Sequence, residues 1–341
     1  MDVSFPHLPA RETHASLPYS QAVEDWPARR ERRSLRVLPR ALRSGAARAL
    51  ALWHLMSLDA VTVAVVWSAA FAWTAGVRVP AWALAMQALA VWAVYVGDRL
   101  LDARAALRTR DLERLRERHF FHWRHRRVLR PAAGLAACAA AGLILIYMPA
   151  MARVRSATLA GAALMYFARV HSGAWDEDGA RGRARRTRRL WKRGLPTKEM
   201  LVGVLFTAGC ALPAMGRMPS AARGAIFCVV SFFALLAWLN CRAIERWEGE
   251  RREGAARSGV TRERAGWRAD WVVAGVGLAM AAVLAAHERA AVLLLMGALS
   301  AMLLAWLDGR RSRMSRVMLR TAADLVLLTP VVLLLLTRMG R

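Results

Sequence analysis

The stretch VWAVYVGDRLLDARAALR, residues 91–108, decides how this chain is organised. A long apolar run ends here in two carboxylates, Asp98 and Asp102, which lie four residues apart with arginines around them. Positions i and i+4 share one face of a helix, so both carboxylates can point towards the same place. The stretch therefore predicts an apolar helix with a polar site at its end.

The apolar residues of the whole chain fall in long blocks. The chain has 341 residues, of which 57% are hydrophobic. Several blocks approach the roughly 20 residues that cross about 30 Å of hydrocarbon. They predict an all-α, polytopic membrane protein with nine transmembrane helices, and the fourth and shortest is either tilted or partly interfacial. The blocks lie at about residues 49–76, 79–97, 131–150, 156–170, 198–215, 221–241, 271–287, 290–307 and 321–337.

The basic residues indicate the orientation. Lys and Arg number 51 against 24 Asp and Glu, and all but eight of them lie in residues 1–48, 98–130, 169–198, 242–270 and 308–320. By the positive-inside rule these segments are cytoplasmic and the C-terminus lies outside, in a multi-pass protein of the inner (plasma) membrane. We expect a basic, largely disordered cytoplasmic arm over 1–48. The transmembrane domain is expected over 49–338, with the other four segments as its cytoplasmic loops.

Two other kinds of site are disfavoured. Nucleic-acid binding would suit the net charge of +27, but no soluble module with interleaved aromatic residues accompanies the arginines. We therefore expect the lipid bilayer, and no nucleic acid, as the partner of the basic segments. The cysteines have no metal-type spacing, so neither a disulfide nor a zinc site is expected. They are Cys138, Cys210, Cys228 and Cys241.

A second acidic cluster repeats the first one four blocks later. The sixth block ends in AWLNCRAIERWEGE, residues 237–250, where Asn240 precedes Glu245 and Glu248. Two carboxylate clusters on one side of a membrane suit Mg²⁺, which takes oxygen ligands and usually shares them with substrate phosphates. Bridging metals would hold a diphosphate, and basic side chains would contact its remaining oxygens. The basic candidates are Arg99, Arg104, Lys198 and Arg242.

The same carboxylates have a second interpretation. Helix ends at a membrane surface are usually charged, and Asp98 stands beside Arg99 as Glu245 stands beside Arg246. Such neighbours can form solvated ion pairs worth less than about 1 kcal/mol each. Spacing alone leaves both the metal–diphosphate site and the simple helix-end charge open.

Two further acids lie inside apolar blocks. Asp59 and Asp324 fall within the first and the last block, a few residues from the expected cytoplasmic ends. Carboxylates inside a membrane are costly and usually face a cavity or a partner. His54 is about one turn from Asp59 and is the expected partner. These residues either line a functional cavity or belong to a buried hydrogen-bond network.

The loops add little to the function. Segment 103–130 predicts an amphipathic surface helix. Its His119, His122 and His125 recur every three residues, which would also suit a metal, but arginines surround them and no acid or cysteine is interleaved, so the surface helix is favoured. Segment 173–194 mixes acidic and arginine clusters and predicts a flexible loop.

The sequence resembles the UbiA-type intramembrane prenyltransferases. That family has nine transmembrane helices, a cytoplasmic N-terminus and aspartate-rich motifs after helices two and six. In VYVGDRLLD, Asp98 and Asp102 match the last two aspartates of the first motif, whereas Val94 and Tyr95 replace its Asn-Asp pair. Glu245 and Glu248 replace the aspartates of the second motif. KEMLVGVLFTAG, residues 198–209, looks like the fifth helix of the family.

The resemblance implies a UbiA-like helical bundle and an activity. Mg²⁺ at Asp98, Asp102, Glu245 and Glu248 would bind a prenyl diphosphate, whose prenyl group passes to a lipophilic or aromatic acceptor. Tyr95, Asn240, Asp59 and Asp324 join the basic candidates as expected substrate-binding residues. Since both motifs depart from the family pattern, an inactive member that binds a lipid or a partner membrane protein is the alternative. A secondary transporter suits the chain less, because nine spans do not divide into two halves.

Overall fold

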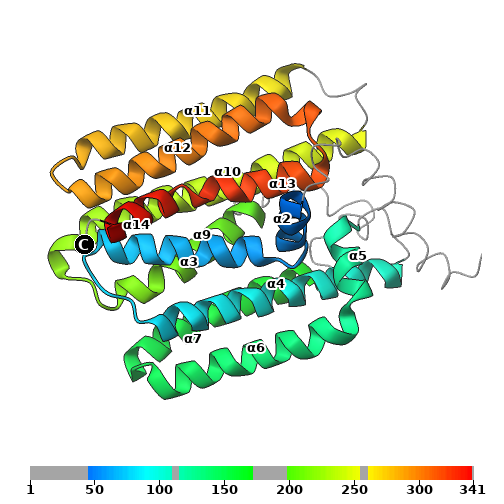
Figure 1. Ribbon diagram of the computed structural model, residues 1–341, viewed down its shortest axis with the longest axis horizontal. Helices are drawn as coiled ribbons and strands as arrows, with labels where there is room; N and C mark the ends of the chain where they lie inside the picture. The colour runs from blue at the N-terminus through cyan, green and yellow to red at the C-terminus, as the bar shows by residue number, and fades with distance from the viewer. Residues whose placement is uncertain (1–44, 110–114, 172–197, 254–259, 340–341) are drawn as a thin grey trace, which may run out of the picture. The chain divides into compact units, whose positions relative to one another are not determined.

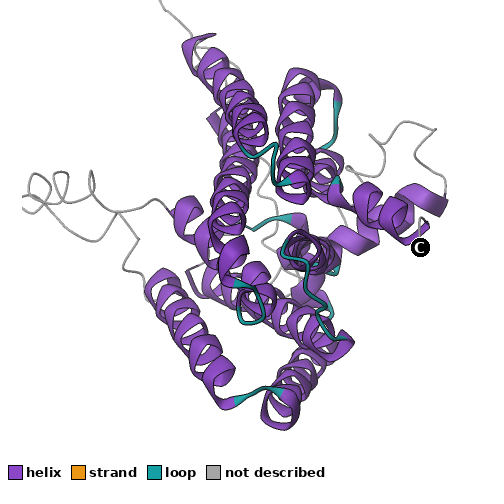
Figure 2. Cartoon of the chain, turned by 90° about the vertical axis from the view of Figure 1, so that its left-hand side faces the viewer, coloured by secondary structure: helices purple, strands orange, loops and turns teal. Residues whose placement is uncertain are grey.

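Helices form the regular structure of the chain in the computed structural model, which describes residues 45–109, 115–171, 198–253 and 260–339. Figure 2 shows only helices and loops in these ranges, so the predicted all-α class is confirmed for them. Each of the nine apolar blocks coincides with a helix or with a bent pair of helices. The predictions for residues 1–44 and for the loop at 173–194 fall outside the described residues.

The first block is two helices rather than one. α2 (Gly45–Leu55) and α3 (Leu58–Thr74) meet at an angle of 83°. Ser57, between them, has φ 58° and ψ 28°, a left-handed conformation that costs an L-residue roughly 1–2 kcal/mol. The prediction of one helix over 49–76 is therefore wrong. The break turns the end of α2 towards the first turn of α3.

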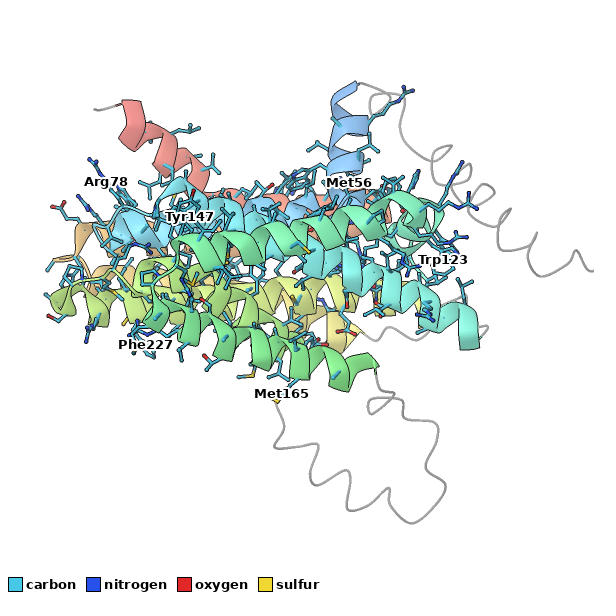
Figure 3. All side chains as sticks on the ribbon, turned by 90° about the horizontal axis from the view of Figure 1, so that it is seen from below. Met56, Arg78, Trp123, Tyr147, Met165 and Phe227 are labelled. Carbon is cyan, nitrogen blue, oxygen red and sulfur yellow. The ribbon has the colours of Figure 1, made fainter. Side chains whose placement is uncertain are left out.

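Successive long helices run antiparallel, so their connections alternate between two ends of the bundle (Figure 1). Short loops join them at one end, where Figure 3 labels Arg78 and Tyr147. The opposite end carries α2, the start of α13 and the short helix α5 with Trp123, and is called the α5 end below. The remaining helices are α4 (Ala81–Thr109), α5 (Glu117–Arg124), α6 (Arg126–Tyr147), α7 (Ala150–His171), α9 (Lys198–Met215), α10 (Arg223–Glu253), α11 (Val260–Val283), α12 (Glu288–Arg310), α13 (Arg316–Leu325) and α14 (Pro330–Met339).

The helices are those of a membrane protein by length and composition. Among the described residues, four are long and apolar enough to cross a membrane, and two bent pairs raise the number to six. The single helices cover Ala81–Leu107, Arg126–Tyr147, Ser220–Glu248 and Glu288–Arg313, and the bent pairs are α2 with α3 and α13 with α14. Shorter apolar helices lie at Glu199–Met215 and Ala269–Val283. That all nine blocks cross the membrane stays a prediction.

Apolar side chains cover much of the outer surface. Leu135 and Ile146 of α6 are each 72% exposed, and Met165 of α7 is 70% exposed (Figure 3). Exposed apolar area on this scale marks a surface that meets lipid or another protein rather than water. The outer faces of α6 and α7 therefore agree with a bundle that is embedded in a bilayer.

A buried aromatic group connects the first block to the last. Trp67 of α3 stacks on Phe233 of α10, with ring centroids 3.8 Å apart. The Nε1 atom of Trp67 donates a 2.8 Å hydrogen bond to the carbonyl oxygen of Leu327, in the 3₁₀ turn η5 (Val326–Leu328). A buried donor without an acceptor would cost free energy. The bond therefore holds α3 against the chain's last block.

The backbones of α9 and α10 meet at Gly203. A Cβ atom there would lie 2.9 Å from the backbone nitrogen of Trp238 and 3.2 Å from its Cα. Backbone atoms cannot move aside as a flexible side chain can, so we predict that Gly203→Ala forces the two helices apart. The expected loss is about 1–3 kcal/mol of stability, which the thermal unfolding midpoint of the detergent-purified protein measures.

Gly209→Ala on the same helix is the matched control. A Cβ atom at Gly209 would have no neighbour within 4 Å, and alanine is the better helix former. Its unfolding midpoint should equal or exceed that of the wild type. Equal midpoints for the Gly203 and Gly209 variants would contradict the close packing of α9 on α10.

Candidate functional site

The acidic residues of both clusters lie inside helices, not at their ends. The predicted blocks end at residues 97 and 241, whereas α4 continues to Thr109 and α10 to Glu253. These extensions are rich in Ala, Arg and Glu, which favour helix, so the helices do not stop where the apolar residues stop. That residues 98–130 and 242–270 lie on the cytoplasmic side stays a prediction.

Segment 103–130 is not one surface helix, which corrects the prediction. α4 ends at Thr109, α5 is a separate short helix that packs on α2 and α4, and α6 begins at Arg126. His119 and His122 are 5% and 0% exposed, so they face the bundle. His119 Nδ1 accepts a hydrogen bond from the backbone nitrogen of Arg116, and His122 Nδ1 donates one to the carbonyl oxygen of Arg118. The packing of α5 on α2 and α4 thus places Arg116 and Arg118 beside the ends of the long helices.

Cationic or histidine side chains lie against Asp98, Asp102 and Glu248, which were predicted to bind metal. Asp98 Oδ2 lies 2.6 Å from Arg99 Nη1. Asp102 Oδ2 lies 3.5 Å from His119 Nε2. Glu248 contacts the guanidinium groups of Arg116 and Arg320, and so connects α10 to both α5 and α13. The helix-end ion pair suggested for Asp98 and Arg99 is therefore present.

The other residues predicted for the site differ in exposure. Glu245, Arg104 and Arg242 are exposed, and Arg242 lies over the Trp238 ring, 5.4 Å from its centroid. Tyr95 lies below the guanidinium of Arg99, with 5.6 Å between the ring centroid and Cζ. Lys198 begins α9, and its side chain is outside the described part of the structure.

Arg118 places a part-buried cation at the α5 end. Its Nε atom is buried and has no hydrogen-bond partner among the described residues, and the same holds for Nε of Arg99. Burial, together with the like charges of Arg99 and Arg116, lowers the pKa of Arg118 to about 9, while Asp59 and Asp98 act in the opposite direction. A buried guanidinium donor that lacks an acceptor favours an anionic ligand.

A second polar group lies deeper, where the first and last blocks meet. His54 Nδ1 lies 2.6 Å from Asp59 Oδ2 and 3.7 Å from Asp324 Oδ2. Asn240 of α10 donates from Nδ2 to Asp324 Oδ1 over 3.2 Å. The predicted partnership of His54 and Asp59 is confirmed, and Asp324 joins it from the other end of the sequence. We call His54, Asp59, Asp324 and Asn240 the His54 group.

Several residues of this end were not predicted. Arg320 lies four positions before Asp324, at the edge of the last apolar block, and this spacing of two charges was a signal in the sequence. Arg116 and Arg118 gave no signal, because many arginines precede and follow them. Arg246, which the helix-end interpretation places beside Glu245, has its Nη2 atom 2.9 Å from Asp308 Oδ1 of α12, and this contact was not predicted. Asp308 is 2% exposed and needs this cation more than a surface glutamate does.

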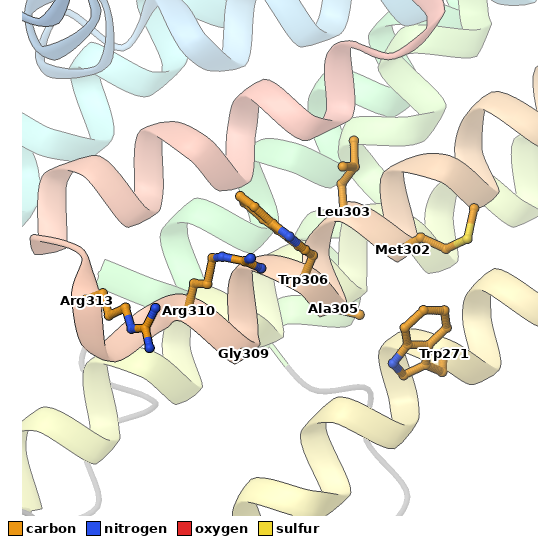
Figure 4. Close-up of a pocket in the computed structure, with 8 residues that line it drawn as sticks. All are labelled: Trp271, Met302, Leu303, Ala305, Trp306, Gly309, Arg310 and Arg313. Atoms are coloured by element: carbon orange, nitrogen blue, oxygen red, sulfur yellow. The ribbon is translucent and has the colours of Figure 1, made fainter.

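A separate pocket of about 690 Å³ lies between α11 and α12 (Figure 4). Trp271 and Trp306 line it, and the guanidinium of Arg310 lies 4.0 Å from the Trp306 ring centroid. Trp and Arg at the ends of apolar helices are typical of anchors in the membrane interface. None of the predicted site residues lines this pocket, so the polar site is a different place.

The α5 end therefore combines acids of α4 and α10, cations of α5 and α13, and the His54 group. No family model, curated protein or solved structure matches the chain. The resemblance to the UbiA-type enzymes stays a prediction that the residues themselves carry. What the site can do chemically follows from its charges: it can hold an anion, a cation or both.

His122 makes the stability of the α5 end depend on pH. Burial lowers its pKa from 6.5 to about 4. The unfolded chain takes up this proton near pH 6.5, before the folded chain does, so the free energy of unfolding falls as the pH drops from about 6.5 to about 4. We predict that His122→Gln, which removes the titrating group, reduces this slope.

Thermal unfolding midpoints in detergent between about pH 4 and 7 measure the effect. The exposed His287, at the opposite end of the bundle, supplies the control His287→Gln, which should keep the wild-type slope. A His122→Gln slope as steep as that of the wild type would show that another group causes the pH dependence.

Proposed function

We propose that the protein is a membrane prenyltransferase similar to the UbiA type. It would bind a prenyl diphosphate at the α5 end and transfer the prenyl group to a lipophilic or aromatic acceptor. The observation that supports this most is the buried Nε donor of Arg118, which lacks a hydrogen-bond partner among the described residues. Diphosphate oxygens are strong acceptors for such a group.

The arrangement of charge supports a ligand with an anionic head and an apolar tail. Arg118 and Arg99 offer buried donors at the α5 end, and the helices continue from there as apolar spans. Phosphate oxygens would accept from the two Nε atoms, while the alkyl chain would lie among the apolar side chains deeper in the bundle. Tyr95, whose ring lies below Arg99, would stand between the head and the tail.

Magnesium fits the carboxylates as an ion that arrives with the diphosphate. Mg²⁺ usually takes one or two carboxylates and completes its shell with water and substrate phosphates, so a preformed cage of protein ligands is not required. Asp98, Asp102, Glu245 and Glu248 would hold it, each in exchange for a present partner. Bound there, it would neutralise charge on the departing diphosphate.

In the proposed reaction the arginines would act on the leaving diphosphate, and the apolar interior would surround the prenyl group and the acceptor. The bond between the first prenyl carbon and the diphosphate oxygen breaks, and the diphosphate leaves with the electron pair. Arg118 and Arg99 would stabilise that leaving group by donating hydrogen bonds to it. The acceptor then forms a bond to the prenyl carbon and loses a proton, in an apolar surrounding that excludes water.

One observation favours the alternative, an inactive protein of the same kind that binds a lipid or a partner membrane protein. Asp98, Asp102 and Glu248 already lie against Arg or His side chains. Tyr95 also stands where the family motif has an aspartate. Ion pairs that persist in the presence of substrate would leave the anion site intact and the metal site closed.

Binding of radiolabelled farnesyl and geranylgeranyl diphosphate to the detergent-purified protein tests the proposal. We predict binding that requires Mg²⁺ and that weakens roughly tenfold or more in Arg118→Gln, because a charged hydrogen bond is worth about 1.5–3 kcal/mol. The double variant Asp98→Asn with Glu245→Gln should lose the Mg²⁺ dependence. Arg127→Gln, an exposed arginine of α6, is the matched control and should bind as the wild type does.

The outcomes separate the two functions. Binding that is indifferent to chelation, to Arg118→Gln and to the double variant would overturn the diphosphate site. Binding that depends on Arg118 but not on Mg²⁺, without release of diphosphate in the presence of lipophilic acceptors, would establish the inactive alternative.

A further inference from the structure

The His54 group has the dimensions of a site for a single metal ion. Nδ1 of His54 and carboxylate oxygens of Asp59 and Asp324 all lie within 4.8 Å of one another, the one such set of three among the described residues. Ligand atoms at about 2.1 Å from one ion are about 3.0–3.4 Å apart. The separations of 2.6 and 3.7 Å from His54 to the two acids lie on either side of that range. The separation between the two acids is also below 4.8 Å, so shifts of about 1 Å would seat an ion.

The side chain of Asn240 offers a further oxygen atom that could bind a cation. The side chain is 5% exposed, and its Nδ2 donates to Asp324. Its Oδ1 is buried and has no hydrogen-bond partner in the part of the chain that the structure describes. An unsatisfied buried acceptor destabilises the folded state. A cation held by Asp324 would give this oxygen a partner.

The charges point the same way. Asp59 and Asp324 bring two carboxylates into the bundle, and a hydrogen bond from His54 reaches only Asp59. Arg118 is near enough to influence both acids, but among the described residues it hydrogen-bonds to neither. Asp59 accepts hydrogen bonds from His54 and from the backbone nitrogen of Ala60, and Asp324 accepts one from Asn240. Hydrogen bonds alone leave two acidic groups close together inside the bundle, which is costly in a membrane. A divalent ion would neutralise both at once.

The helices that carry the two acids are interrupted, as helices at ion sites of membrane proteins often are. The two segments that supply the acids are broken helices, α2 with α3 at 83° and α13 with α14 at 41°. Ser57, next to the group, holds the left-handed conformation described above. Interrupted membrane helices commonly carry ion sites, and retained backbone strain is typical of functional positions.

We propose that His54, Asp59 and Asp324, with Oδ1 of Asn240, bind one divalent transition-metal ion, Mn²⁺ or Zn²⁺. An imidazole nitrogen beside carboxylates favours these ions over Mg²⁺, which prefers oxygen ligands alone. The site is distinct from the carboxylates Asp98, Asp102, Glu245 and Glu248, and it does not depend on the prenyltransferase proposal. Its place below Arg118 would let the bound ion draw an anionic ligand towards the bundle.

Titration of the metal-stripped, detergent-purified full chain with Mn²⁺, followed by electron paramagnetic resonance, tests the site. We expect about one tightly bound ion per chain, which Zn²⁺ displaces. Pulsed spectra should show coupling of Mn²⁺ to a nitrogen, and His54→Gln should abolish it. Asp324→Asn should weaken binding roughly tenfold or more. The double variant Asp98→Asn with Glu245→Gln is the matched control and should bind Mn²⁺ at this site as the wild type does.

Several results would overturn the metal site. They are the absence of binding by the wild type, a bound ion without nitrogen coupling, and affinity that Asp324→Asn leaves unchanged. In the first case the group would be a hydrogen-bond network. Thermal unfolding checks that each variant is folded. If Asp324→Asn is not, Asn240→Ala decides: weaker binding supports the site, and unchanged binding contradicts it.

Discussion

The cost of burying charge is the constraint on which the rest of this structure depends. Carboxylates and guanidinium groups lie inside one end of a largely apolar bundle, and burial there is costly unless each meets an opposite charge or a hydrogen bond. Glu248 meets that need through Arg116 and Arg320, which come from helices on either side of it in the sequence. Asp308 meets it through Arg246. These pairs determine which helix ends assemble together.

The same constraint shows which polar groups at the α5 end are available to a ligand. Once the pairs are formed, the buried atoms that still lack hydrogen-bond partners among the described residues include two cationic donors, on Arg118 and Arg99, and one acceptor, on Asn240. They lie at two levels, the cations near α5 and the acceptor beside Asp324. Under the two proposals, an anion would bind at Arg118 and Arg99, and a cation would bind next to it at the His54 group. Most of the other buried side chains are apolar, which under the proposed function would suit a lipid tail.

The sequence was sufficient for features that depend on neighbours along the chain. The nine apolar blocks predicted where helices lie, and the contact of His54 with Asp59 followed from five residues of separation. Features that depend on tertiary packing could not be predicted. The break at Ser57 and the burial of His122 follow from how α2 and α5 pack. The partner of Arg246 was missed because Asp308 is distant in sequence and becomes near only when α10 packs on α12.

The contacts between the first and last blocks have a consequence for biosynthesis. His54 and Trp67 find Asp324 and the carbonyl of Leu327 about 260–270 residues later in the chain. At the usual rate of translation, on the order of tens of seconds separate the synthesis of the two ends. During that interval the polar groups of the earliest helices lack these final partners. Until the last helix is made, these groups must therefore form hydrogen bonds with water, lipid headgroups or the insertion machinery.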